Sequence, residues 1–251
     1  MSRKVDLSNP MPKARGVEKR QADIVFCIDS TASMKPCIDG VKQNLHEFVS
    51  GLQTTAAVDF RVRLIAYRDI HDPTSPGPPW LETEFSKPMS IEPFLTDLGN
   101  TIADGGGDYA TGESTLDALY RALKRSKWRE PPCQRCIVLL TDDDTHPTLH
   151  PSTYDGPLND VEIVTAELQL LPHPFLCMFV PDYPSYRQIA EQALRAHGQG
   201  KLFVQYVGSV HDRESHRGLH QIDWKRHMRF LGQSISLATV SVVREGQKNK
   251  Q

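Results

Sequence analysis

The chain has 251 residues, of which 39% are hydrophobic and 24% are charged. This composition is that of a globular protein with a hydrophobic core, and the length fits one large α/β domain or two small ones. The 29 basic and 31 acidic residues give a formal net charge of −2. That balance argues against a nucleic-acid-binding protein, which usually carries a basic excess. The sequence contains no apolar run of about 18 residues, so we expect no membrane span.

The first residues, 1–21, are rich in Lys and Arg and lack the apolar core of a signal peptide. We expect them to form a flexible basic leader, with a tether for an acidic partner as the alternative. Residues 244–251 are expected to be a flexible tail. Because the rest shows no internal repeat and no linker, residues 22–243 are predicted to be a single domain. The absence of a secretory signal predicts a cytoplasmic protein with reduced thiols.

Two of the five cysteines, Cys133 and Cys136, form a CxxC pair. One such pair supplies only two zinc ligands, and no matching second pair is present. A redox role stays open, but a thioredoxin-like pair opens a helix, whereas this pair precedes a predicted strand. We interpret both residues as structural thiols.

Short apolar, β-branched runs predict strands, and apolar residues at helical spacing predict helices. The first half of the chain is predicted to contain a strand at 23–28, a helix at 37–52, a strand at 59–69, a loop at 71–80, a short edge strand at 81–86 and helices at 90–104 and 114–126. The second half is predicted to contain strands at 135–142, 174–180 and 201–206 and helices at 160–171, 185–198 and 224–243. This alternation predicts an α/β fold with a parallel sheet covered by helices on both faces.

An oxygen-rich run follows the first predicted strand, in the stretch "ADIVFCIDSTASMKP" (22–36). Asp29, Thr31 and Ser33 stand at alternate positions, so their side-chain oxygens can point the same way. Asp142 ends another predicted strand, and ligands of such sheets bind at the carboxyl ends of strands. Oxygen donors suit Mg²⁺, Mn²⁺ or Ca²⁺ rather than zinc. The alternative is an ordinary turn followed by a helix N-cap.

A glycine-rich loop adds a further oxygen donor, from Asp108, Thr111 or both. Together, three segments resemble the metal-ion-dependent adhesion site of a von Willebrand factor type A domain, also called an integrin I-like domain. The segments that carry the resemblance are "VFCIDSTASM" (25–34), "GGGDYATGES" (105–114) and "IVLLTDDDTH" (137–146). The resemblance extends from residue 22 to residue 206. It implies a doubly wound, mostly parallel sheet with one antiparallel edge strand.

The resemblance also implies a divalent ion, Mg²⁺ or Mn²⁺, at the top edge of the sheet. The metal ligands that it assigns are Asp29, Thr31, Ser33, Asp108 and Asp142. By resemblance, Thr31 and Ser33 coordinate directly, while Asp142 acts mainly through water. Thr111 is the rival of Asp108, because many members use Thr in this loop. An Asp ligand would partly neutralise the ion, which predicts tighter metal binding and a weaker pull on a partner's acid.

We therefore expect a non-catalytic adaptor that binds another protein, whose acidic residue completes the coordination of the metal. The chain resembles the intracellular, bacterial-type branch of the family, which includes adaptor subunits of stress and defence operons. We expect neither nucleic acid nor membrane as a partner. The alternative is a Mg²⁺-dependent hydrolase or phosphotransfer enzyme that uses the same acidic crevice. A haloacid-dehalogenase-type phosphatase needs D-x-D, and Thr31 replaces its second acid.

Several nearby polar residues have simpler interpretations. Glu113 is expected to be a helix-start acid, with holding of a metal-bound water as the alternative. Asp143 and Asp144 are expected to be exposed charges at the rim of the site. His146 and His150 are expected to belong to a polar loop on the top face.

Two later segments are less specific. The histidine-rich stretch 211–227 is expected to be a solvated connection, with metal binding as the alternative. The predicted C-terminal helix, 224–243, is hypothesised to shift when a partner binds, as in extracellular relatives.

Overall fold

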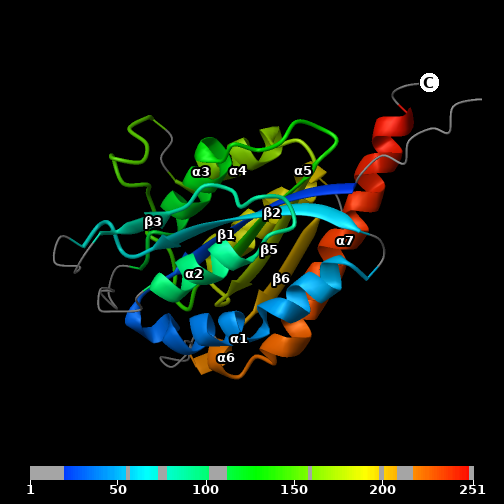
Figure 1. Cartoon of the computed structure of the whole chain (residues 1–251). Helices are drawn as coiled ribbons and strands as arrows, with labels where there is room; N and C mark the ends of the chain where they lie inside the picture. Colours follow the sequence, from blue (N-terminus) through cyan, green and yellow to red (C-terminus); the bar gives the residue numbers. More distant parts are fainter. Residues whose placement is uncertain are drawn as a thin grey trace, which may run out of the picture.

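A computed structural model describes residues 20–54, 57–72, 78–101, 112–157, 160–197, 201–207 and 217–248. The strands of this described part are β1 (Arg20–Asp29), β2 (Val58–Tyr67), β3 (Trp80–Glu82), β4 (Gln134–Leu140), β5 (Pro174–Val180) and β6 (Leu202–Tyr206). They form one sheet in the order β3-β2-β1-β4-β5-β6. Only β3 runs antiparallel to its neighbour, and the other pairs are parallel. The predicted doubly wound, mostly parallel fold is therefore confirmed (Figure 1).

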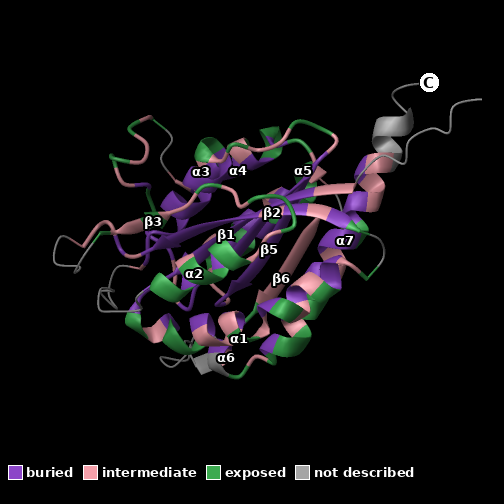
Figure 2. Cartoon of the chain, viewed as in Figure 1, coloured by how far each residue is buried: buried purple, intermediate pink, exposed green. Residues whose placement is uncertain are grey.

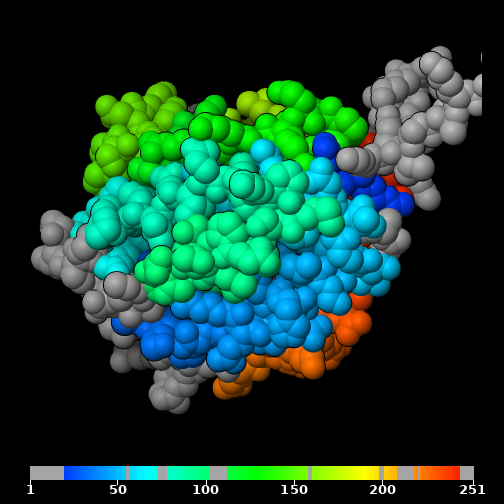
Figure 3. Space-filling model, viewed as in Figure 1, coloured from blue at the N-terminus to red at the C-terminus, as the bar shows by residue number. Residues whose placement is uncertain are grey.

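Helices cover both faces of the sheet. One face carries α1 (Lys35–Leu52), α2 (Glu92–Asn100) and α7 (Trp224–Lys248). The other face carries α3 (Thr115–Arg125), α4 (Val161–Leu170) and α5 (Pro184–His197). In the space-filling view, α2 lies on the surface between α1 and the layer of α3 and α4 (Figure 3).

Alternate residues of the central strands enter two separate hydrophobic cores. In β1, Phe26 packs with α1 and α7, whereas Cys27 packs with α3 and its neighbours. Both are fully buried, which explains why β1 reads as a continuous apolar run rather than an alternating one. Figure 2 shows the central strands buried, while β6 at the sheet edge is only half-buried.

The structure differs from the sequence-based expectation at some element ends. β1 begins at Arg20, inside the segment expected as leader, because it pairs with β2 from Arg20 opposite Val58 onward. The rest of that leader lies outside the described residues. A short helix, α6 (Arg217–His220), lies within the stretch expected to be a connection, so the loop assignment was wrong there. α7 continues to Lys248, into the segment expected to be a flexible tail.

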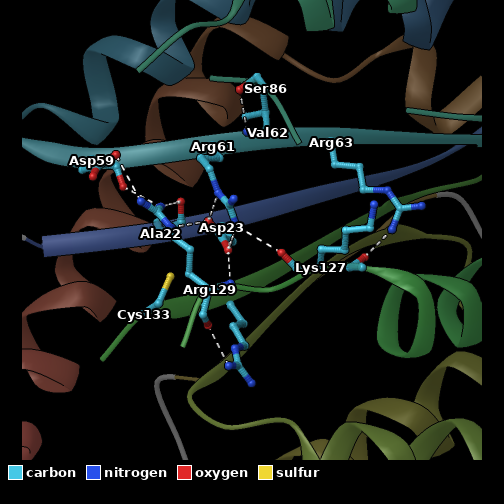
Figure 4. A network of polar contacts seen from close by, with 12 residues as sticks. Ala22, Asp23, Asp59, Arg61, Val62, Arg63, Ser86, Lys127, Arg129 and Cys133 are labelled. Atoms are coloured by element: carbon cyan, nitrogen blue, oxygen red, sulfur yellow. Dashed lines mark hydrogen bonds and ion pairs between the residues drawn. The ribbon is translucent and has the colours of Figure 1, made fainter. Parts of the chain in front are cut away.

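At the amino edge of the sheet, where its parallel strands begin, one buried carboxylate connects neighbouring segments. Asp23 has no exposed surface. It accepts hydrogen bonds from Nε of Arg61 at 2.9 Å and from Nε of Arg129 at 2.8 Å (Figure 4). Arg129 also donates to the carbonyl oxygens of Ala22 and Asp59, at 2.9 and 2.8 Å. These contacts hold the segment that leads into β4 against the first residues of β1 and β2.

The cysteines agree with a structural role. All five are buried free thiols. Burial, followed by the charge of Asp23, raises the pKa of Cys133 to about 11. Burial also raises the pKa of Cys136 well above its usual value. Thiols of this kind are protonated and unreactive at neutral pH.

Helices α1 and α7 approach each other through two glycines. A Cβ atom on Gly232 would lie 2.2 Å from the carbonyl oxygen of Phe48, and one on Gly51 would lie 2.3 Å from that of Arg229. Such distances are far below van der Waals contact, so only glycine permits this backbone packing. The close approach fixes the C-terminal helix against α1.

We predict that Asp23→Asn lowers the free energy of unfolding by about 3 kcal/mol, because two guanidinium groups lose their buried counter-charge. Denaturant unfolding measures this change. Asp39→Asn is the control, since its ion pair with Lys35 is exposed and should contribute less than about 1 kcal/mol. Equal stability of the two variants would contradict the role given to Asp23.

We predict that Gly232→Ala destabilises the protein by about 1–3 kcal/mol, because the added methyl group pushes α7 away from α1. Gly99→Ala is the matched control. Gly99 also lies in a helix, but a Cβ atom there has nothing within 4 Å. The control should be stabilised by up to about 1 kcal/mol through helix propensity. Thermal unfolding of both variants separates the two effects, and a stabilised Gly232→Ala would refute the close packing.

Candidate metal centre

The first predicted ligand, Asp29, is the last residue of β1 and has no exposed surface. Its Oδ1 accepts hydrogen bonds from the backbone N of Thr31 at 2.9 Å and from the Thr31 hydroxyl at 2.8 Å. Its Oδ2 accepts one from the Thr141 hydroxyl at 3.0 Å. A carboxylate that accepts a hydrogen bond from the backbone N–H two residues later forms an Asx-turn. The alternative interpretation of this stretch as a turn is therefore correct for Asp29.

The Thr31 hydroxyl does not serve as a helix cap. Thr31 occupies the N-cap position of a short 3-10 helix, Ala32–Met34, yet its side chain makes no capping hydrogen bond. Its hydroxyl instead donates to Asp29 and lies 3.3 Å from the Ser33 hydroxyl. A hydroxyl that donates its proton to a carboxylate keeps lone pairs that can face a cation. The structure thus brings Asp29, Thr31 and Ser33 together.

Asp142 joins this group from the neighbouring strand. It follows β4, which pairs directly with β1, and only 4% of its surface is exposed. Burial raises the pKa of Asp29 to about 8, and the nearby Asp142 carboxylate contributes in the same direction, against the hydrogen bonds from Thr31. Two acids therefore share one buried edge, as the strand order requires.

Glu113 also lies at this edge. Its side chain is more buried than expected for an acid at the start of a helix. It precedes α3, is 3% exposed, and forms a parallel bridge with Thr145 in the loop after β4. Burial raises its pKa to about 11, and the next largest influences are four carboxylates. These belong to Asp29, Asp69, Asp143 and Asp142.

A fourth acid, Asp69, follows β2, and the sequence patterns had not singled it out as a site residue. Nε2 of His146 lies 2.7 Å from its Oδ1, and the backbone N of His71 donates to the same atom at 2.8 Å. Burial would raise the pKa of Asp69, but these two contacts outweigh it and lower the pKa. The signal was present, because Asp69 ends the predicted strand 59–69. Three neighbouring strands, β2, β1 and β4, are thus each followed by an acid.

One expectation for the loop after β4 was wrong, because Asp143 and Asp144 are half-buried rather than exposed. His146 lies in this polar loop but is only 6% exposed, and it packs against the His71 ring with 3.9 Å between ring centroids. The hydroxyl of Tyr186 donates to the Asp143 carbonyl at 2.7 Å. These residues are partly or fully buried because the loop packs over the carboxyl edge of the sheet.

Other predicted positions are not described. Asp108 and Thr111 lie outside the described residues, so the choice between them stays open, and His211 and His216 lie outside them too. Within the described part of the chain, no three side chains of His, Cys, Asp or Glu are arranged to hold a metal ion. A centre built from the described residues alone would therefore need hydroxyl oxygens as well as carboxylates. None of the helices described is long and apolar enough to cross a membrane.

Comparisons with known proteins identify the family of the fold. The von Willebrand factor type A domain profile matches residues 23–169, more than half of the chain. No curated protein matches the chain.

Among solved structures, proximal thread matrix protein 1 from the mussel byssus is similar with a TM-score of 0.51 and 14% identity. The similarity covers 87% of this chain and 49% of that one. The pilus adhesin SpaC from Lactobacillus rhamnosus GG is similar with a TM-score of 0.52 and 12% identity, over 88% of this chain and 31% of the adhesin. This chain thus spans at most about half the length of these proteins, and at such identities the likeness shows the fold alone. By its profile match, the chain belongs to the von Willebrand factor type A domain family.

Proposed function

We propose that this chain binds Mg²⁺ or Mn²⁺ at the carboxyl edge of its sheet and recognises a partner protein there. The observation that carries the proposal is the convergence of two buried carboxylates, Asp29 and Asp142, with the hydroxyls of Thr31 and Ser33. Buried like charges are stable together only when a proton or a cation compensates them. All four side chains offer oxygen, the donor that Mg²⁺ and Mn²⁺ prefer.

Each residue has a distinct part in the proposed centre. Thr31 and Ser33 offer hydroxyl oxygens directly, and Asp29 orients the Thr31 hydroxyl while contributing charge. Asp142 acts mainly through water. Asp108, outside the described residues, is the proposed fifth donor, with Thr111 as its alternative. These residues would hold the ion, and a bound Mg²⁺ would let a carboxylate from outside the domain join its coordination.

The family supports a protein partner. Domains of this type commonly mediate protein–protein interaction or adhesion, and the two similar structures are a matrix protein and an adhesin. We propose that the chain acts as a non-catalytic adaptor in the cytoplasm and that its partner presents an acidic residue to the metal. Any catalysis in such an assembly belongs to the partner.

We predict that Mg²⁺ and Mn²⁺ bind to the protein at one saturable site and that Asp29→Ala abolishes this binding. Isothermal titration calorimetry measures it directly. At a metal concentration of about 100 times Kd, binding should also stabilise the wild-type protein by about 2.7 kcal/mol. Asp39→Ala, at the exposed start of α1, should bind metal like the wild type.

Recognition is tested with the same variants. Partner proteins captured by the wild type in Mg²⁺ should be lost with chelator and with Asp29→Ala, and retained by Asp39→Ala. Wild-type protein that binds neither Mg²⁺ nor Mn²⁺ would refute the proposed function.

We predict that the metal-free protein loses stability as pH rises from about 4 to about 8. Burial raises the folded-state pKa of Asp29 to about 8, above its usual value of 3.8, so the folded state binds the proton more tightly. The resulting stability is present below the lower value and is lost as the pH passes the higher one. In Asp29→Asn this contribution is removed, because the amide does not ionise.

Urea unfolding in chelator at both ends of this range tests the pH prediction. At high pH, Asp29→Asn should be more stable than the wild type by at least about 1.4 kcal/mol, the equivalent of one pKa unit. Parallel pH profiles for the two proteins would contradict it.

A further inference from the structure

We infer that this chain forms a homodimer in which β6 of one copy pairs antiparallel with β6 of a second copy, so that two sheets join into one. This dimer does not depend on the proposed metal centre. Four features of the β6 edge support it: the direction of its backbone groups, the lack of charge and proline on the strand, the apolar side chains of α7 beside it and the charges on α5.

The backbone of β6 divides its hydrogen-bonding groups between two sides. The carbonyl oxygen of Lys201 accepts from the N of Leu176 in β5 at 3.0 Å. The N of Val207 donates to the carbonyl oxygen of Val180, just as close at 2.9 Å. Backbone groups alternate in direction along a strand, so the residues between these positions take turns in facing β5. The residues whose N–H and C=O point to the outer edge are therefore Leu202, Val204 and Tyr206.

Antiparallel pairing centred on Val204 uses all of these outward groups. With Val204 opposite its own copy, Leu202 stands opposite Tyr206 of the second copy, and each such pair exchanges two hydrogen bonds. Among the strands that the structure describes, none occupies this edge. The Tyr206 carbonyl oxygen accepts instead from the side-chain amide of Gln205 at 3.2 Å, as expected of a group turned away from β5. Because the paired strands run in opposite directions, the two carboxyl edges lie at opposite ends of the dimer.

β6 lacks the features that protect the opposite edge of the sheet from such pairing. After β3 the chain continues along β2, where its backbone N–H groups donate to carbonyl oxygens of that strand. This stretch exposes two charged residues and a proline, Glu84, Lys87 and Pro88, which discourage the addition of another strand. The sequence of β6, LFVQY, has neither charge nor proline, and Tyr206 is 38% exposed. An open and neutral edge strand favours strand addition.

Apolar side chains on α7 extend the surface beside this edge. Phe230 is 47% exposed, and its ring centroid lies 5.3 Å from that of Phe203 in β6. Leu237 is 59% exposed and follows about two helical turns later on the same face of α7. In the dimer, Phe203 stands opposite Gln205 of the second copy, on the sheet face that carries α7. Association thus buries apolar surface that a single chain exposes to water.

Charged side chains on α5 favour a second copy of the chain as the partner. Burial raises the pKa of Tyr206, and the charges of Arg187 and Glu191 also act on it, so this side of α5 lies beside β6. Arg195 follows one turn after Glu191, and the two exposed side chains lie 3.6 Å apart. The two-fold axis of the dimer sets α5 antiparallel to its copy, so Glu191 of each chain approaches Arg195 of the other. The same surface is therefore complementary to itself in charge as well as in strand direction.

Sedimentation velocity of the full chain over a range of concentrations tests the inference. The wild type should show a monomer–dimer equilibrium. Arg195→Glu should raise the dimer Kd by about tenfold, because two attractive contacts become repulsive. Adding Glu191→Arg to that variant should restore the affinity. Lys35→Glu is the matched control, since it reverses a charge in the exposed pair with Asp39 on α1 and should dimerise like the wild type.

Hydrogen exchange gives a second readout that identifies the surface. The amides of Leu202, Val204 and Tyr206 should become protected as the protein concentration rises. The amide of Val207, which is bonded within the sheet, should be protected at every concentration. A wild type that stays monomeric, or a dimer that is indifferent to Arg195→Glu, would overturn the inference. Protection of the three amides in the monomer would also overturn it, because the edge would then be covered within one chain.

Discussion

The carboxyl edge of the sheet concentrates buried acids that repel one another, and the structure around it is arranged to hold them in place. Asp29, Glu113 and Asp142 are each less than a tenth exposed. In a low-dielectric interior, their mutual repulsion is much stronger than it would be in water. This edge can therefore be stable only if protons or a cation compensate the charge, and that requirement links the stability of the fold to the chemistry of the site.

Hydrogen bonds from neighbouring segments orient the acids. Thr141, between β4 and Asp142, donates to Asp29 across the pair of central strands. The bridge between Glu113 and Thr145 ties the start of α3 to the loop after β4. Asp69 differs from the others, because its contacts with His146 and His71 lower its pKa. The edge thus contains one acid, Asp69, whose pKa is lowered by histidine beside two acids, Asp29 and Glu113, whose pKa values are raised by burial.

The opposite edge and the helix layers supply the rigid frame. At the amino edge, Asp23 is compensated by Arg61 and Arg129, so a buried charge there strengthens the fold. On one face, the contact of Gly51 and Gly232 brings α1 and α7 together. The two edges of one sheet therefore differ in their buried charge: one closes an ion-pair network, and the other gathers acids whose pKa values burial raises.

Sequence patterns were sufficient to predict the sheet and the helices that cover it, because the strands are apolar and the helices are amphipathic. The strands 23–28 and 174–180 were placed close to the observed β1 and β5, and the antiparallel edge strand followed from the resemblance to the family. Element ends were less certain because pairing and packing decide them. Arg20 joins β1 because β2 lies beside it, and no local pattern shows that neighbour.

The sequence by itself determined the acid and hydroxyls after β1 and the acid after β4 as one candidate site, because parallel strands place their carboxyl ends at the same edge. Only the tertiary structure decided that Asp69 belongs to the same edge, that Glu113 is buried there and that His146 is buried against Asp69. These residues come from loops that are distant in the chain. Their burial and charge environment arise from how those loops pack over the sheet, which local spacing does not encode.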